Sequence, residues 1–408
     1  MSAPSSRPLR ILLYGDFRTS HANGWLAGLR AAGMDVQPLS GELVSVQHAD
    51  VPQVVDPVAR LRRLLVSRGL NTAIRTRLSG PHSAEPGTTA RGRTIDPLQL
   101  AETALTPTRM PWQVSAIRRR VRLDRPDIVH ALRMPYEGLL TLAAVRDLPV
   151  VVSSWGQDFT SQSARDPLLR FWMTRVAGRI SGLHVDAVSD RDRAMEHGLS
   201  PHAPWVHAAG NFGVDTTLFY PAQPPGPLRV VYPRGRRSYV NHRAFLEVAA
   251  ASASDERLHF IGVGLAGDPD AELLAARLGP GRLTLTPELP RTEFAAVLRS
   301  SSFVLSPATS DGTPNSVLEA LACGAAVVGG GIPSVSALLA PPTIGRLVDP
   351  HRPDLWVGEF AAALRLEEHL AARRLNPDRV SAEYRIAENL KRIPDFYADV
   401  LRYWEGER

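Results

Sequence analysis

The stretch SPATSDGTPNSVLEALACGAAVVGG, which runs from Ser306 to Gly330, keeps two carboxylates in a segment that is otherwise mostly apolar. Glu319 stands among Val, Leu and Ala residues whose spacing predicts a helix of about three turns over residues 314–323. Asp311 lies eight positions earlier, in the loop before that helix. The two acids therefore bracket the predicted start of a helix.

Residues of suitable chemistry mark both ends of this helix. Thr313 is a favourable N-cap, Pro314 fits the first helical position, and Gly324 fits the left-handed turn that ends a helix. The free N–H groups of the first turn, aided by the helix dipole, form a site for an anion. The residues predicted to form that site are Gly312, Thr313, Pro314, Asn315, Ser316 and Val317.

The two acids suit a ligand that carries a diphosphate between two sugars. Helical side chains lean toward the N-terminus, so Glu319 points back toward the anion, roughly 9 Å along the axis from Thr313. A carboxylate there can accept both hydroxyl protons of a ribose on the diphosphate, while Asp311 faces a sugar on the far phosphate. The alternative interpretation is that Glu319 is only a solvent-facing residue of an amphipathic helix and that Asp311 only favours a turn.

Composition places the chain among ordinary globular proteins. Its 408 residues suffice for two domains, with 44% of them hydrophobic and 22% charged. Cys323 is the only cysteine, the apolar run Ile11 to Leu13 is too short for a signal peptide, and no apolar run is long enough to span a membrane. We therefore expect a cytoplasmic protein.

The net charge of +6 would suit nucleic acid, an anionic membrane or an anionic small substrate. Lys391 is the only lysine among 47 basic residues, which indicates a GC-rich bacterial genome rather than a specialised binding surface. Such a source makes antibiotic or other specialised-metabolite biosynthesis an expectation. The arginine-rich stretches 59–78 and 115–125 are expected to be solvated helix faces, with association to a membrane surface as the less favoured alternative.

Short apolar runs typical of buried strands alternate with helix-like segments along the chain. The pattern restarts after YPAQPPGPL, Tyr220 to Leu228, whose four prolines exclude a helix or a central strand. The sequence therefore predicts an α/β protein of two doubly wound domains, residues 1–220 and 228–385. Residues 79–114 are predicted to form a long loop of the first domain.

The last segment, residues 386–408, carries an apolar stripe at helical spacing. The stripe is too apolar to be left in water, and the second domain is predicted to be complete by about Leu347. Its members are Leu390, Ile393, Phe396, Tyr397, Val400, Leu401 and Trp404.

The opening stretch resembles the signature of retaining glycosyltransferases of family 4, the broad group with the GT-B fold. The family pattern is E-G-x-P-x-x-x-L-E-A-x-A-x-G-x-P-V-V, and the segment from Asp311 to Val328 follows it with two departures. Asp311 replaces the first Glu, which retracts the carboxylate by one methylene, and Ala326 replaces the usual Pro. The resemblance implies two Rossmann-like domains that face each other across a cleft, with 386–408 as a helix crossing back to the first domain.

Other segments resemble the same family in the expected order. VYPRGRRSYVN resembles the phosphate-binding turn, with Arg234 as the donor-phosphate arginine and Arg237 in place of the family's lysine, backed by His242 or Arg243. GNFGVDTTLFYP resembles the segment that enters the linker. Gly24, in the first segment after the N-terminal strand, is a further predicted donor contact.

Two segments of the first domain resemble the acceptor side of the family's cleft. RPDIVHA carries His130, and SSWGQDF resembles the family's H-G-x-D or W-G-x-D turn, with Trp155 and Asp158. The resemblance implies that these three residues bind the acceptor. Taken singly, each has an ordinary alternative, such as a buried hydrogen-bonded histidine, a core aromatic or a helix cap.

The resemblance implies a retaining glycosyltransferase that moves a sugar from a UDP- or GDP-linked donor to a small-molecule acceptor. Arg234, Asp311 and Asp158 are the predicted catalytic residues, and Glu319 is a predicted donor contact. No cofactor or metal is expected, because basic side chains and helix amides replace the cation in such enzymes. The alternative functions are a sugar-nucleotide epimerase of the same fold and, ranked last, a basic nucleic-acid-binding protein. The sequence does not decide between a monomer and a homodimer.

Overall fold

The computed structural model describes residues 7–17, 19–41, 97–155, 158–159, 167–222, 226–237 and 239–407. Its first domain is built on a six-stranded sheet in which all described pairings are parallel. The strands, in order across the sheet, are β2 (Asp35–Ser40), β1 (Arg10–Gly15), β3 (Ile128–Ala131), β4 (Val150–Ser154), β5 (Gly182–Val185) and β6 (Trp205–His207).

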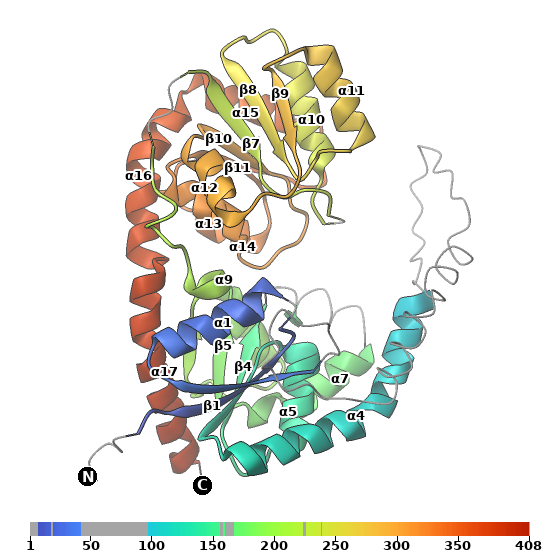
Figure 1. Ribbon diagram of the computed structural model, residues 1–408, viewed down its shortest axis with the longest axis vertical. Helices are drawn as coiled ribbons and strands as arrows, with labels where there is room; N and C mark the ends of the chain where they lie inside the picture. Colours follow the sequence, from blue (N-terminus) through green and yellow to red (C-terminus); the bar gives the residue numbers. More distant parts are fainter. Residues whose placement is uncertain are drawn as a thin grey trace.

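The second domain is built on another six-stranded parallel sheet. Figure 1 shows the two sheets in separate halves of the molecule, joined along one side by a long helical segment. The predicted fold, two doubly wound α/β domains, is confirmed. The strands, in order, are β12 (Gly345–Val348), β11 (Ala326–Gly330), β10 (Phe303–Ser306), β7 (Leu228–Tyr232), β8 (Leu258–Val263) and β9 (Leu283–Thr286).

Both faces of the first sheet are covered, because alternate residues of each strand point to opposite sides. On β1, Leu12 and Tyr14 pack into one core, whereas Ile11 and Leu13 pack into the other. The first core is closed by α4 (Pro97–Asp124), α5 (Leu139–Ala144), α7 (Pro167–Val176) and α8 (Ser189–Glu196). The second is closed by α1 (Ser20–Ala31), α9 (Ala209–Phe212) and α17 (Ile386–Gly406).

The second domain has one continuous core that extends to its last two helices. Trp356 and Phe360 are fully buried in it, so the prediction that this domain is complete by about Leu347 is wrong. The helices that contribute are α10 (His242–Ala251), α11 (Pro269–Leu278), α12 (Arg291–Arg299), α13 (Asn315–Ala322), α14 (Pro333–Leu338), α15 (Leu355–Arg365) and α16 (Glu368–Glu383).

Two chain segments pass between the domains side by side. Val214 pairs with Arg385 in a short parallel bridge, and the Asn389 amide donates to the Phe212 carbonyl at 2.8 Å. Val214 already packs in the core of the second domain, upstream of the proline-rich stretch, while α17 runs back along the first domain (Figure 1). The connection between the domains is thus a pair of neighbouring crossings.

The long loop predicted over residues 79–114 is wrong for its second part, since α4 begins at Pro97. Ile117 of this helix is fully buried and packs in the first core, so tertiary burial stabilises a helix that the local Pro and Thr content does not favour. The basic stretch 115–125 lies on its last turns, where Arg118 donates to the Ala143 and Ala144 carbonyls. The stretch 59–78 lies outside the described residues.

Each sheet has one point where the strand order reverses direction, and such points bind ligands at the carboxyl ends of the strands. In the first domain this point lies between β1 and β3, and in the second between β7 and β10. Within the described ranges, no helix combines the length and the apolar character needed to cross a membrane.

Candidate active site

The helix of the opening stretch is present as α13, from Asn315 to Ala322, and Gly324 adopts the predicted left-handed conformation with φ of 79°. The predicted N-cap is wrong: Pro314 is the capping residue, and no side chain caps the helix. The Thr313 hydroxyl is unavailable for capping because it donates to the Asp186 carbonyl of the first domain. The helix start is therefore defined by contact between the domains.

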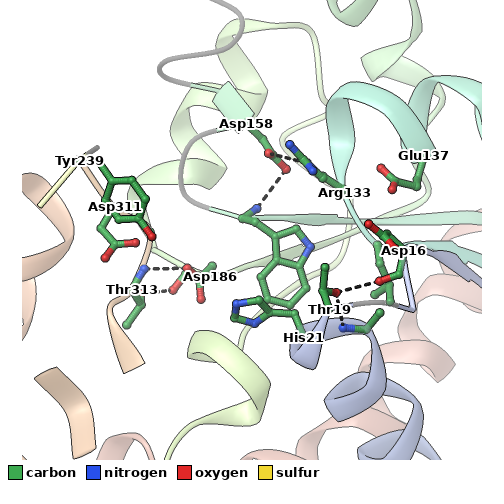
Figure 2. Close-up of a pocket in the computed structure, with 14 residues that line it drawn as sticks. Asp16, Thr19, His21, Arg133, Glu137, Asp158, Asp186, Tyr239, Asp311 and Thr313 are labelled. Carbon is green, nitrogen blue, oxygen red and sulfur yellow. Dashed lines mark hydrogen bonds and ion pairs between the residues drawn. The ribbon is translucent and has the colours of Figure 1, made fainter. Parts of the chain in front are cut away.

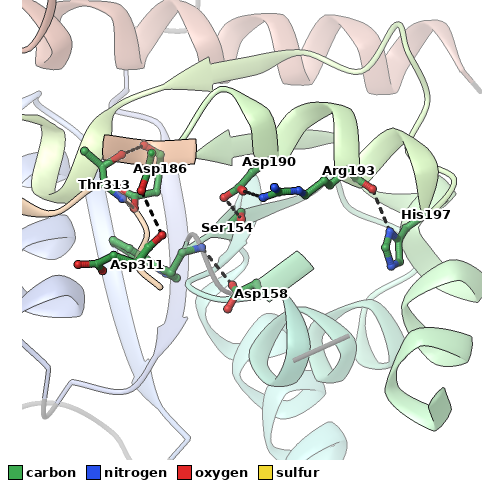
Figure 3. A network of polar contacts seen from close by, with 10 residues as sticks. Ser154, Asp158, Asp186, Asp190, Arg193, His197, Asp311 and Thr313 are labelled. Carbon is green, nitrogen blue, oxygen red and sulfur yellow. Dashed lines mark hydrogen bonds and ion pairs between the residues drawn. The ribbon is translucent and has the colours of Figure 1, made fainter. Parts of the chain in front are cut away.

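Asp186, directly after β5, ties the two domains together at this point (Figure 3). Its carboxylate accepts the Thr313 N–H at 2.6 Å from the second domain and the Gly210 N–H from α9. Burial raises the pKa of Asp186 to about 7, although both N–H groups act in the opposite direction. Asn315 packs so closely on Gly210 that a Cβ at that position would overlap its side-chain oxygen. The loop before α13 is thus held from the first domain.

Asp186→Ala is expected to lower the free energy of unfolding by about 1–3 kcal/mol, because the buried N–H groups of Gly210 and Thr313 lose their acceptor. Chemical denaturation measures the change, with Asp192→Ala, an exposed carboxylate of α8, as the control. Equal stability of the two variants would show that the contact between the domains contributes nothing.

The phosphate-binding turn predicted after β7 meets the loop after β10. Arg234 is largely buried, pairs with Asp311, and lies 3.4 Å from the Tyr239 hydroxyl and over the Tyr239 ring. Burial raises the pKa of Asp311, while the Arg234 guanidinium acts in the opposite direction. Two of the three predicted catalytic residues are therefore in contact, at the switch point of the second sheet.

A pocket of about 300 Å³ lies between the domains (Figure 2). Asp311, Gly312, Thr313 and Tyr239 line it from the second domain. Its first-domain wall comes from the segments that follow four strands. Asp16, Thr19 and His21, the last of these in α1, follow β1, and Arg133 and Glu137 follow β3. Trp155 and Asp158 follow β4, and Asp186 follows β5. The structure thus brings the predicted residues Trp155, Asp158, Asp311, Gly312 and Thr313 to one cavity.

Asp158, the third predicted catalytic residue, is buried in the pocket wall. Its carboxylate accepts the N–H groups of Met134 and Trp155 at 3.2 and 3.1 Å, and the Arg133 guanidinium lies 3.8 Å away. Burial raises the pKa of Asp158 to about 7, although these partners act to lower it. The carboxylate therefore orders the turn after β4 against the turn after β3.

The remaining predicted residues lie outside the pocket lining. Glu319 is buried and pairs with Arg291 of α12 at 2.9 Å, and burial raises the pKa of Glu319 to about 7. Arg237 is half-exposed and pairs with Glu288 at 3.6 Å. Gly24 lies inside α1.

His130 is likewise remote from the pocket lining. It is fully buried on β3, with its two ring nitrogens 2.6 Å from the Tyr397 hydroxyl and 2.8 Å from the Ser153 hydroxyl. Burial lowers the pKa of His130 well below its usual value. Among the candidates behind Arg237, His242 faces Asp268 at 3.4 Å and Arg243 faces Asp270 at 3.7 Å.

Sequence reasoning missed several residues of the pocket, and a signal existed for most of them. Asp16, Arg133 and Asp186 each follow the carboxyl end of a strand, where parallel sheets bind ligands. Glu137 had no local signal, and neither had Arg291, which pairs with Glu319 outside the pocket lining. Across the described part of the chain, no group of three or more His, Cys, Asp or Glu side chains is placed to hold a metal ion.

Residues 230–365 match the family described as Glycosyl transferases group 1. Over 99 residues the chain is 33% identical to D-inositol 3-phosphate glycosyltransferase of Segniliparus rotundus, a match that covers 24% of this chain and 22% of that protein. The chain therefore matches about a fifth of the length of this curated relative. The family match contains the end of β7, Arg234, Asp311 and α13, so the candidate donor loops lie inside it.

Solved structures share the whole two-domain architecture. Sucrose-phosphate synthase of Thermosynechococcus elongatus has a TM-score of 0.66 at 16% identity, covering 97% of this chain and 99% of that one. HepE of Anabaena in complex with UDP and glucose has a TM-score of 0.62 at 13% identity, covering 96% and 99%. Trehalose 6-phosphate synthase of Burkholderia multivorans has a TM-score of 0.66 at 13% identity, covering 98% of this chain and 100% of that one. These likenesses show the GT-B fold, and with the family match they support a GT-B glycosyltransferase.

Proposed function

We propose that the protein is a retaining glycosyltransferase that moves a sugar from a nucleotide-diphosphate sugar, linked to UDP or GDP, to a small-molecule acceptor. One observation carries the proposal: the loop that leads into α13 and the loops of the first sheet's switch point line a single pocket between the domains. Its volume of about 300 Å³ suits a monosaccharide-sized group.

The donor diphosphate is assigned to the start of α13. The Ser316 hydroxyl there is buried without a hydrogen-bond partner among the described residues, and a hydroxyl can donate to a phosphate oxygen. The free N–H groups of the first helical turn and the nearby Arg234 add positive potential. The HepE structure, which shares the fold, holds UDP and glucose, and this supports the same ligand class here.

The proposed chemistry proceeds on one face of the sugar. The bond between C1 and the phosphate oxygen breaks, the acceptor hydroxyl bonds to C1 from the same face, and its proton passes to the leaving phosphate. Arg234 and the helix amides stabilise the charge that develops on the diphosphate, in the role a metal ion would otherwise fill. Asp311 orients the sugar, and Asp158 orders the acceptor side.

The protein alone is incubated with a panel of UDP- and GDP-sugars, and slow hydrolysis of each sugar nucleotide is measured. Transfer is then measured with candidate acceptors. Release of one nucleoside diphosphate above background supports the proposal, and retention is checked by NMR of the anomeric proton in the product. Inversion at C1 would overturn the retaining mechanism. Nucleotide-sugar binding followed by sugar epimerisation without transfer would favour the epimerase.

Glu319→Ala is expected to weaken binding of the donor nucleotide by about 1.5–3 kcal/mol, since a carboxylate on ribose hydroxyls makes charge-assisted hydrogen bonds. Calorimetry with UDP and GDP measures the change, with Glu293→Ala, an exposed carboxylate of α12, as the matched control.

Arg291→Ala separates a ligand role of Glu319 from a structural one, because Arg291 pairs with Glu319. If Glu319→Ala and Arg291→Ala lose stability alike while nucleotide affinity stays at the wild-type value, the carboxylate serves the ion pair and the assignment fails.

The proposal also includes the route of the acceptor and the biosynthetic setting of the enzyme. The acceptor would enter from the first-domain wall, where Trp155 and Asp158 lie. The lysine-poor composition supports a place in specialised-metabolite biosynthesis of a GC-rich bacterium.

A further inference from the structure

The pocket between the domains is strongly acidic for a site that accepts a sugar. Its described lining holds five carboxylates and one arginine, Arg133, together with His21. The carboxylates are Asp16, Glu137, Asp158, Asp186 and Asp311. Anionic ligands would be repelled by such a wall unless most of these charges are compensated within the protein.

Three of the five carboxylates are compensated. Asp311 pairs with Arg234, Asp186 accepts two backbone N–H groups, and Asp158 accepts two more and faces Arg133. Groups of the protein itself therefore compensate the charges of these three carboxylates.

Glu137 differs from these three. Its Oε2 atom is buried and has no hydrogen-bond partner among the described residues. Arg133, whose charge favours the ionised form of Glu137, directs its guanidinium to Asp158 and over the Tyr136 ring, 5.4 Å from the ring centroid. A buried carboxylate oxygen without a donor costs free energy, so its retention at a pocket wall indicates a donor that arrives with a ligand.

Unusual backbone geometry holds Glu137 in this place. It lies in a π-helical turn, η1 (Met134–Gly138), which follows directly on β3 and is closed by the Gly138 N–H donating to the Arg133 carbonyl at 2.8 Å. Arg133 itself has φ of 144°, a conformation that side chains rarely adopt. π-Helical turns are frequent at functional sites.

We propose that the acceptor carries a protonated amino group, as in an amino sugar or an aminocyclitol, and that this ammonium donates hydrogen bonds to Glu137. The inference rests on the proposed glycosyl transfer and names the class of its acceptor. Figure 2 shows Glu137 and Asp311 on opposite sides of the pocket in that view. The ammonium group would thus bind at the first-domain wall while a hydroxyl of the same molecule faces the donor loop.

A protonated amine suits this wall better than a neutral hydroxyl does. An ammonium group brings three donors and a full positive charge, and hydrogen bonds between charged partners are about twice as strong as neutral ones. Asp16 and Asp158 contribute further negative potential around Glu137 from the loops after β1 and β4.

Proton release on binding provides a signature of this contact. Burial raises the pKa of Glu137 to about 8, opposed by Arg133 on its own loop and supported by Asp158 and Asp16, while His21 faces the pocket from α1. Burial therefore shifts the unliganded group toward its protonated form near neutral pH. An ammonium ion stabilises the ionised form and lowers this pKa, so binding releases a proton, and affinity for the amine rises with pH toward the pKa of Glu137 as long as the amine stays protonated.

The test uses matched pairs that differ in one group: glucosamine against glucose, and scyllo-inosamine against scyllo-inositol. Binding is measured by calorimetry at pH 7, with and without saturating UDP, in two buffers of different ionisation enthalpy. We expect each amine to bind about tenfold or more tightly than its hydroxyl partner, which is the range of a charge-assisted hydrogen bond. We also expect binding of the amine to release a proton. Glu137→Gln is expected to abolish both the preference and the proton release.

Glu196→Gln, an exposed carboxylate of α8, is the matched control and is expected to keep both. UDP binding by each variant reports an intact donor site. Equal affinity for amine and hydroxyl partners in the wild type, or a preference that survives Glu137→Gln, overturns the inference even if UDP binds. An amine preference without binding of any nucleotide would instead overturn the glycosyltransferase proposal and leave the amine site standing.

Discussion

Arg234→Ala is expected to lower turnover about a hundredfold or more at saturating donor. Arg234 is largely buried beside Asp311, and we propose that its fixed positive charge stabilises the charge that develops on the diphosphate. Removal of one preorganised donor of this kind typically costs about two to three orders of magnitude in turnover. Steady-state kinetics with the donor found in the hydrolysis panel measures the effect.

Two further variants separate charge from architecture at this position. Arg234→Lys keeps the charge but loses the planar fork, so we expect turnover between the wild type and Arg234→Ala. Asp311→Asn removes the buried charge that Arg234→Ala would leave unpaired. Arg277→Ala, an exposed arginine at the end of α11, is the control. Turnover of Arg234→Ala close to that of Arg277→Ala would show that the assignment is wrong.

Deletion of residues 387–408 is expected to make the protein insoluble or inactive. Ile393, Phe396, Tyr397 and Val400 are buried in the core that α17 shares with the first domain. Loss of one such side chain costs about 2–5 kcal/mol, so the loss of four is as large as the roughly 5–15 kcal/mol that stabilises a typical domain. The deletion also removes the Tyr397 hydroxyl from the buried His130.

A single substitution tests the same helix when the deletion does not fold. Phe396→Ala is expected to lower the free energy of unfolding by about 3–5 kcal/mol, whereas Glu405→Ala on the exposed face leaves it nearly unchanged. Chemical denaturation measures both. A truncated protein that remains soluble, monodisperse and fully active would show instead that α17 is a dispensable tail.

The architecture was predictable because its signals are local. Apolar runs, glycine and proline positions, and the restart after residue 228 all act within a few residues of the chain, and they predicted two doubly wound domains. The helix after Asp311 and the turn at Gly324 were predicted for the same reason, since backbone conformation there follows from the residues themselves. The resemblance added a cleft between the domains.

The failures have a common cause in contacts that span long sequence distances. The segment from Pro97 was predicted as a loop on its Pro and Thr content, yet its helix packs through Ile117 in a core built by strands from earlier and later parts of the chain. Thr313 was predicted to cap α13, but its hydroxyl meets Asp186, which lies 127 positions away. No local pattern can report a partner that only folding brings near.

The sequence by itself determined the two sheets, the helix after Asp311 and its glycine stop, because periodicity and backbone preference are properties of short segments. Only the tertiary structure decided which residues form the pocket. Strand order places the ends of β1, β3, β4 and β5 side by side, and the contact of Asp186 with Thr313 holds the second domain against them. The Oε2 atom of Glu137 becomes a buried oxygen without a hydrogen-bond partner among the described residues only there, because its surroundings come from the segments after β1, β3 and β4.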